Sequence, residues 1–328
     1  MASKIGGAKI AQKAEKTRAP RTNMKEQIRE LITKGNQEIS PINKKIVLTG
    51  ENGTSKSSIS LKLLTAGMEL PEKVPLLNED GKKIKDENGD FMMVWPDEDL
   101  KDHEFIFYVD VDNSGYEIAS NFFSDYLDTR RIILWKPMQT TTTEEGSTIV
   151  DEGETVRAIA TAAATLQDLV AEGYKIKGVI VDGISFVLQY CEAFMRDEKG
   201  LGADEGAKHQ IWKIRNDKFR EFKDPFMALP VPVIFIGHED FIPEYVQPGQ
   251  NFASVKQKLI DECSMRIILH KENSTVTPGV EHYVATIKKD RSNVLVVNKE
   301  FIFMTVNNKE EVVDTDASNL INAVFPQL

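Results

Sequence analysis

The sequence predicts an α/β protein with a mainly parallel sheet, helices on both faces of that sheet and an antiparallel C-terminal edge. Short apolar runs alternate with longer helical stretches through most of the chain, and such alternation is typical of a parallel sheet covered on both faces. The last three apolar runs are joined only by short connections, which antiparallel strands allow and parallel strands do not.

The expected elements can be placed in order. A short amphipathic helix at 23–35 carries Met24, Ile28, Leu31 and Ile32 at helical spacing. Further helices are expected at 56–69, 154–171, 186–196 and 207–223. Strands are expected at 45–49, 105–111, 131–135, 178–181, 231–236, 265–269, 283–287 and 294–297.

The chain divides into three expected regions. Residues 1–40 form a basic flexible arm plus the short helix, residues 41–310 form the core, and residues 311–328 form a C-terminal tail. The arm is basic because residues 1–25 hold seven Lys or Arg and one acid. An acidic insertion is expected at 71–104, and Asn88-Gly89 between two short runs indicates a hairpin within it.

Composition limits the class of protein. With 328 residues, of which 41% are hydrophobic and 28% charged, the chain can bury a sizeable core. A net charge of −10 argues against a protein that binds nucleic acid over its whole surface. Cys191 and Cys263 lack the spacing of a disulfide framework or a zinc site. Since no apolar run reaches membrane-span length and no secretory signal is visible, we expect no membrane partner and a cytoplasmic location, the host's cytoplasm for a viral protein.

The most informative segment is the loop 50–58, which follows the expected strand 45–49 and opens the expected helix 56–69. In that setting backbone N–H groups cradle phosphate, Lys56 reaches the β- and γ-phosphates, and the Ser57 hydroxyl sits on Mg²⁺. One residue departs from the phosphate-loop pattern, because Ser55 stands where glycine is usual and its Cβ restricts the backbone. The alternative is a small polar turn. The nucleotide-binding candidates are Gly50, Glu51, Asn52, Gly53, Thr54, Ser55, Lys56, Ser57 and Ser58.

Acidic residues follow two other expected strands. Asp182 ends the strand 178–181 and is the candidate partner of Ser57 in holding Mg²⁺. Asp110 and Asp112 end the strand 105–111 on one face, and one of them could orient and deprotonate an attacking water. The alternative for all three is a residue that begins a turn.

Two further elements carry candidate catalytic residues. His238 emerges at the end of strand 231–236, where it could sense the γ-phosphate or serve as a hydrogen-bonded structural residue. Lys289 and Arg291 lie between the last strands, where they could bind phosphate or simply lie solvated in an exposed turn.

Taken in order, these motifs resemble those of the RecA-type ATPases, and among them the phage-type single-strand-annealing and recombination ATPases. The resemblance covers residues 42–304. It matches 50–58 to the Walker A loop and 179–182 to Walker B. It also implies that Asp112 is the catalytic carboxylate and that His238 is the strand-end sensor. Lys289 and Arg291 resemble the Lys-x-Arg element that reaches the nucleotide of a neighbouring subunit.

The resemblance implies an ATPase that uses ATP and Mg²⁺, is stimulated by single-stranded DNA, and works as a homo-oligomeric filament or ring in recombination, repair or replication. It further implies that loops at 199–208 and 242–259 face DNA, although a plain surface loop explains the second equally well. Two alternatives stay open: a hexameric DnaB-like helicase motor, and a nucleotide-gated assembly protein with weak hydrolysis.

Overall fold

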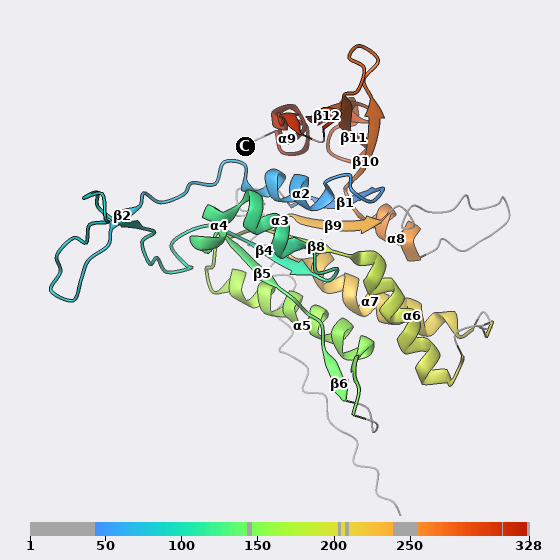
Figure 1. The fold of residues 1–328 in the computed structure, drawn as a ribbon. Coiled ribbons are helices and arrows are strands. Elements are labelled where there is room, and N and C mark those ends of the chain that lie inside the picture. The colour runs from blue at the N-terminus through green and yellow to red at the C-terminus, as the bar shows by residue number, and fades with distance from the viewer. Residues whose placement is uncertain are drawn as a thin grey trace, which may run out of the picture. The chain divides into compact units, whose positions relative to one another are not determined.

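The computed structural model describes residues 43–142, 146–202, 205–206, 210–238, 255–309 and 311–326, which belong to one compact unit. The arm expected at 1–40 and its short helix lie outside the described residues. Within them, a nine-stranded sheet has the order β13-β12-β11-β10-β1-β9-β8-β4-β5 (Figure 1). The strands are β1 Lys45–Gly50, β4 Phe105–Asp110, β5 Ile132–Trp135, β8 Ile176–Asp182, β9 Val233–His238, β10 Met265–Asn273, β11 Glu281–Asp290, β12 Glu300–Val306 and β13 Val312–Asp314.

The predicted fold class is confirmed. The strands from β10 through β1, β9, β8 and β4 to β5 are parallel, and β11, β12 and β13 continue the sheet as antiparallel strands. Central strands of a parallel sheet are buried on both faces, which explains why the apolar runs of β1 and β8 do not alternate with polar residues.

Helices cover both faces of this sheet (Figure 1). On one face, Ile46 and Leu48 of β1 pack with apolar residues of the first helices and the last helix, whereas Val47 points into the opposite layer. The first layer holds α2 Lys56–Thr65, α3 Gly115–Phe122, α4 Ser124–Asp128 and α9 Ser318–Val324. The second holds α5 Glu152–Ala171, α6 Ile184–Lys199, α7 Trp212–Ala228 and α8 Val255–Glu262.

Helix α7 runs further than the sequence predicts. The helix is expected to end at residue 223, yet it continues through Pro225 to Ala228. Phe222 and Phe226 are fully buried, and both pack edge-on against Phe235 of β9. Burial of these two rings outweighs the hydrogen bond that the proline removes.

The prediction of a strand at 294–297 is wrong. Val294–Val296 forms a 3₁₀ turn, in which the Asn293 side chain accepts a hydrogen bond from the Leu295 N–H. Val294 and Leu295 are both 76% exposed, whereas Val296 of the same run is buried in the core. The strand next to β11 is β12, which begins at Glu300.

The segment 71–104 carries two short strands, β2 Val74–Pro75 and β3 Met93–Val94, which pair antiparallel. Between them the chain makes the same turn twice, eight residues apart. The Oδ1 atoms of Asn78 and Asp86 each accept two backbone N–H groups from the residues that follow. Gly81 and Gly89 occupy the same place in the two turns, with φ of 75° and 87° that favours glycine.

This repeat also closes a ring of backbone hydrogen bonds. Leu76 N–H donates to the carbonyl of Met92, Met92 N–H to that of Ile84, and Ile84 N–H to that of Leu76. The backbones at residues 76, 84 and 92, spaced eight residues apart, are thus hydrogen-bonded to one another in a small triangle. The sequence pattern indicates the second turn, but the repeat becomes clear only from the backbone hydrogen bonds that join its three segments.

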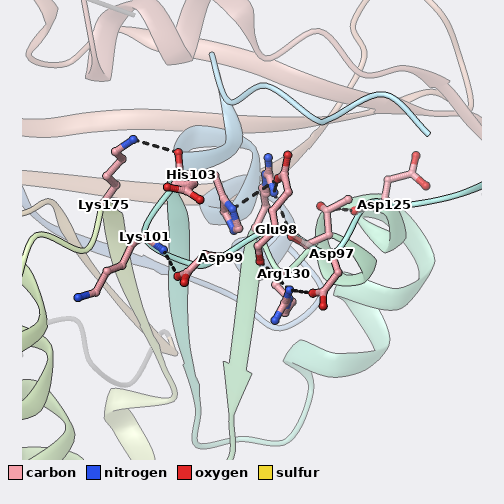
Figure 2. A network of polar contacts seen from close by, with 11 residues as sticks. Asp97, Glu98, Asp99, Lys101, His103, Asp125, Arg130 and Lys175 are labelled. Atoms are coloured by element: carbon pink, nitrogen blue, oxygen red, sulfur yellow. Dashed lines mark hydrogen bonds and ion pairs between the residues drawn. The ribbon is translucent and has the colours of Figure 1, made fainter. Parts of the chain in front are cut away.

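An ionic network holds the end of this segment to the start of the neighbouring strands (Figure 2). Arg131, which precedes β5, donates to Glu98 Oε2 at 2.7 Å, and Arg130 pairs with Asp97. His103, which precedes β4, lies with Nδ1 3.5 Å from the same Glu98 oxygen. Its ring is buried, and within the described part of the chain neither ring nitrogen has a hydrogen-bond partner.

The burial of His103 predicts a pH dependence of stability. Burial, reinforced by the charge of Arg131, lowers the pKa of His103 below its ordinary value near 6.5. The unfolded chain therefore takes up this proton first as the pH falls, and stability is lost from about pH 6.5 downwards to the folded pKa. Thermal melts at pH 7 and pH 5 should show a larger loss for the parent than for His103→Gln. Equal losses would contradict the assignment.

Candidate nucleotide site

The loop between β1 and α2 has the backbone of an anion-binding turn. A Cβ at Gly50 would lie 2.4 Å from the carbonyl oxygen of Leu269, so only glycine fits there. Gly53 and Ser55 both have positive φ, of 73° and 58°. Helix α2 has no acidic residue in its first turn and no side chain that caps it. Its first N–H groups and the positive end of its dipole are therefore available to an anion.

Lys56 places its ammonium group inside this loop. Its Nζ donates to the carbonyl oxygens of Gly50 at 3.0 Å and Glu51 at 2.7 Å. Burial lowers the pKa of Lys56, and the nearby charges of Asp182 and Asp112 partly oppose that shift. The loop thus holds a partly desolvated cation among aligned backbone dipoles, which is a favourable setting for phosphate.

Asp182 lies at the centre of the site. It ends β8, is buried, and accepts hydrogen bonds from Ser57 Oγ and Tyr108 OH on the same oxygen, Oδ2. Burial raises the pKa of Asp182 to about 7, with a further contribution from the charge of Asp112. The serine of the loop and the acid of the second motif, 125 residues apart in sequence, are therefore in direct contact.

The two acids after β4 differ in environment. Asp110 is buried and lies beside Asp182 in the strand register; its Oδ1 accepts from Gly115 N–H at 3.1 Å. Burial raises the pKa of Asp110. Asp112 is only partly buried, and its Oδ1 accepts from both the N–H and the hydroxyl of Ser114, at 3.0 and 2.7 Å. Asp112 is thus the acid that combines a fixed orientation with access to water.

His238 ends β9 directly beside Gly50 in the strand register, so it belongs to the same edge of the sheet as the loop. Its backbone N–H donates to Ser185 Oγ at 3.0 Å. Its ring meets Phe186 edge-on, with ring centroids 5.6 Å apart. This contact holds the partly buried imidazole ring of His238 at the end of β9.

Lys289 and Arg291 do not join this group. In the strand register Asp290 pairs with Met265, which pairs with Ile46 at the start of β1, whereas the loop follows Gly50 at the end of β1. The two cations therefore lie at the opposite edge of the sheet from the loop of their own chain, about 13 Å away along the strands.

At that edge both cations bind the C-terminal end of α8. Lys289 Nζ donates to the carbonyl oxygens of Ile260 at 2.6 Å and Asp261 at 2.9 Å, and Arg291 also donates to that of Asp261. Cations at a helix C-terminus satisfy its last carbonyl groups and its dipole. Between them, Asp290 is buried and pairs with Lys44 at 3.3 Å.

The segments expected to face DNA are only partly described. Residues 203–204, 207–208 and 242–254 lie outside the described residues. Lys199 ends α6 and pairs with Glu198 at 3.6 Å. Lys256 and Lys258 lie on α8, so this end of the expected loop 242–259 is a helix; Lys258 is exposed.

A pocket of about 830 Å³ opens beside the loop. The sequence does not reveal this pocket, because its walls come from strands and helices that lie far apart in the chain. Lys271 stands at its rim, where Nζ pairs with Glu281 at 3.5 Å and lies 4.9 Å from the centre of the Tyr283 ring. The lining includes Ser55, Ser58, Lys62, Phe123, Tyr283 and Phe303. Tyr108 was missed as well, since a tyrosine in an apolar strand looks like an ordinary core residue.

The donor set fits a magnesium nucleotide. Ser57 and Asp182 offer oxygen ligands, which Mg²⁺ prefers, and Mg²⁺ usually takes one or two protein oxygens with phosphate and water supplying the rest. Asp110 Oδ2 is a further buried oxygen without a hydrogen-bond partner in the described part of the chain. No group of three or more His, Cys, Asp or Glu side chains suited to a metal occurs among the described residues.

The loop after β1, Asp110, Asp182 and His238 thus meet at the carboxyl edge of the parallel strands of this α/β sheet. No family model matches the chain, and no curated protein matches it either. A solved KaiC-like protein from the archaeon Pyrococcus horikoshii is similar over 84% of this chain and 91% of its own, at 11% identity and a TM-score of 0.41. A likeness this distant says nothing about what the chain binds. In the described part of the chain, no helix has the length and apolar character that crossing a membrane requires.

The backbone at Ser55 predicts that Ser55→Gly stabilises the protein. An L-residue in the left-handed region costs about 1 kcal/mol, which glycine does not incur. The matched opposite change is Gly53→Ala, whose Cβ would meet nothing closer than Lys271 Nζ at 3.7 Å, so it adds only the backbone strain. Denaturant unfolding should show a gain for the first variant and a loss of about 1 kcal/mol for the second. Stabilities that change in the reverse order would contradict the left-handed assignment.

Proposed function

We propose that this protein binds and hydrolyses ATP and acts on single-stranded DNA in recombination, repair or replication, as the phage-type RecA-core ATPases do. The observation that carries the proposal is the contact between Ser57 of the loop and the buried Asp182, with the Lys56 ammonium inside the loop. A small polar turn needs neither a buried cation nor a buried acid from a strand 125 residues away.

Each side chain has a distinct role in this proposal. The loop N–H groups and Lys56 would hold the phosphates, with Lys56 neutralising charge that develops on the transferring group. Ser57 and Asp182 would hold Mg²⁺, which would offset the negative charge of the phosphates. Asp112 would orient the attacking water and accept its proton, and His238 would lie near the γ-phosphate.

The pocket beside the loop would take the nucleoside. It is continuous with Ser55 and Ser58 of the loop, and its apolar wall of Phe123, Tyr283 and Phe303 suits a base. Lys271 and Glu281, which pair with each other in its lining, would bind the polar groups of the ribose. The loop and the acids of this site fall within the proposed core 41–310, with residues 1–40 proposed as a basic flexible arm plus a short helix. Residues 311–328 are proposed as a C-terminal tail, whose β13 and α9 pack onto that core.

Nucleic-acid binding would be electrostatic. The candidate contacts are Lys256, Lys258 and the basic residues within 1–25, set on a chain of net charge −10. A site of this kind loses affinity steeply as salt rises, because counterions are released from phosphate on binding. Removal of residues 1–22 should weaken binding without abolishing DNA-stimulated hydrolysis.

Two experiments on the purified protein test the function and separate its alternatives. ATP hydrolysis is measured with and without single-stranded DNA, together with particle size, and strand unwinding is measured alongside. Stimulation by DNA without unwinding supports the recombination ATPase. Unwinding by a ring favours the helicase motor. Nucleotide-dependent assembly with slow, DNA-independent hydrolysis favours the assembly protein, for which Ser55 in the glycine position is the relevant observation.

Point variants test the roles within the site. Lys56→Ala should lower the hydrolysis rate by about 10²–10³-fold and weaken nucleotide binding, since it removes a cation from developing phosphate charge. Asp112→Asn should keep nucleotide binding and lose hydrolysis, because an amide cannot accept the proton. Lys213→Ala, on the exposed face of α7, is the control and should match the parent. Full turnover in Asp112→Asn, or a loss confined to Asp110→Asn, would move the role to Asp110.

The distance of Lys289 and Arg291 from their own loop predicts a site shared between subunits. Arg291→Ala subunits should be inactive alone, since a finger of this kind contributes roughly 10³–10⁵-fold to the rate. Mixed with inactive Lys56→Ala subunits they should regain part of the activity, because some interfaces pair an intact loop with an intact arginine. The rate should also rise faster than linearly with protein concentration. A mixture that stays inactive, with specific activity independent of concentration, would contradict the shared site.

A further inference from the structure

Tyr108 is a buried polar side chain to which the proposed reaction assigns no role. It lies in β4, opposite Ile180 of β8, and is fully buried. Its hydroxyl donates to Asp182 Oδ2, the same oxygen that accepts from Ser57 Oγ. Burial, with the charge of Asp182, raises the pKa of Tyr108 well above its ordinary value, so the phenol keeps its proton and acts as a donor.

Gly115, the first residue of α3, makes room for this ring. A Cβ built on Gly115 would lie 2.5 Å from Tyr108 Cε1, 2.9 Å from Cζ and 3.1 Å from the hydroxyl oxygen. The ring therefore lies directly against the backbone of Gly115. The N–H of the same residue donates to Asp110 Oδ1 at 3.1 Å. The start of α3 thus fixes both the neighbouring acid and the tyrosine that holds Asp182.

We propose that Tyr108 is the positioning residue for the metal-binding carboxylate: its hydroxyl, held in place by Gly115, fixes the orientation in which Asp182 meets Mg²⁺. This inference rests on the proposed function. With two donors on Oδ2, the carboxylate cannot rotate about its Cβ–Cγ bond without breaking a buried hydrogen bond. Partners that orient a metal ligand in this way typically change metal affinity by about 10–100-fold when removed.

A merely structural tyrosine makes a different prediction. If Tyr108 only fills space in the core, Tyr108→Phe keeps the ring and its packing and changes stability but not the need for metal. If Tyr108 positions Asp182, the same variant leaves the ring in place and changes the affinity for Mg²⁺. Nucleotide binding measured against Mg²⁺ concentration, and again in a chelator, therefore separates the two roles without using hydrolysis.

For Tyr108→Phe we expect the Mg²⁺ concentration at half-maximal nucleotide binding to rise about 10-fold, with nucleotide affinity in the chelator unchanged. Gly115→Ala should shift it in the same direction, since the added methyl group displaces the ring from Asp182. Tyr116→Phe is the matched control, because Tyr116 is the neighbouring tyrosine of α3 and is 59% exposed; it should bind as the parent does. Circular dichroism and melting confirm that each variant is folded.

A double-mutant cycle makes the test specific for Asp182. In an Asp182→Asn background, Tyr108→Phe should cause no further change in the Mg²⁺ requirement, because the two residues act through one carboxylate. The role of Tyr108 is overturned if a folded Tyr108→Phe or Gly115→Ala protein has the parent's Mg²⁺ requirement, or if the two changes add independently. A parent protein that binds no nucleotide at any Mg²⁺ concentration overturns the proposed function itself, and the role of Tyr108 with it.

Discussion

The hydrogen-bonded burial of Asp182 is the constraint on which the rest of the site depends. A carboxylate that is removed from water costs several kcal/mol unless donors and a nearby cation compensate it. Here the donors come from two other elements, Ser57 at the start of α2 and Tyr108 in β4, and Lys56 supplies the charge. The three elements must therefore be in register for the carboxylate to be satisfied, which couples the geometry of the site to the packing of the core.

The parallel sheet explains which candidate residues meet. Strand ends of one direction lie at one edge, so the loop after β1, the acids after β4 and β8 and the histidine of β9 converge there without any special loop. The antiparallel β11 runs the other way, and its last residues reach the opposite edge. Chain direction alone thus separates Lys289 and Arg291 from the loop after β1 of their own chain.

The insertion at 71–104 is built and attached by different forces. Its two turns are local, since Asn78 and Asp86 each satisfy the backbone that follows them. Its attachment is long-range, through the ion pairs that Arg130 and Arg131 make at the start of β5. Because these pairs lie at the amino edge of the sheet, the insertion is anchored away from the nucleotide site, and changes in one need not disturb the other.

The sequence by itself determined what depends on neighbouring residues: the loop between a buried strand and a helix, the alternation that builds the sheet, and acids at strand ends. It failed where distant contacts decide the outcome. The run 294–297 looks like a strand, but its first three residues form a 3₁₀ turn in which Val294 and Leu295 are exposed. Helix α7 passes through Pro225 because Phe226 is buried against β9. Tyr108 has the pattern of a core residue, and only the packing of β4 against β8 and α3 turns its hydroxyl onto Asp182. Tertiary structure decided these points because strand register and burial join residues far apart in the chain, and no local pattern records which residues those are.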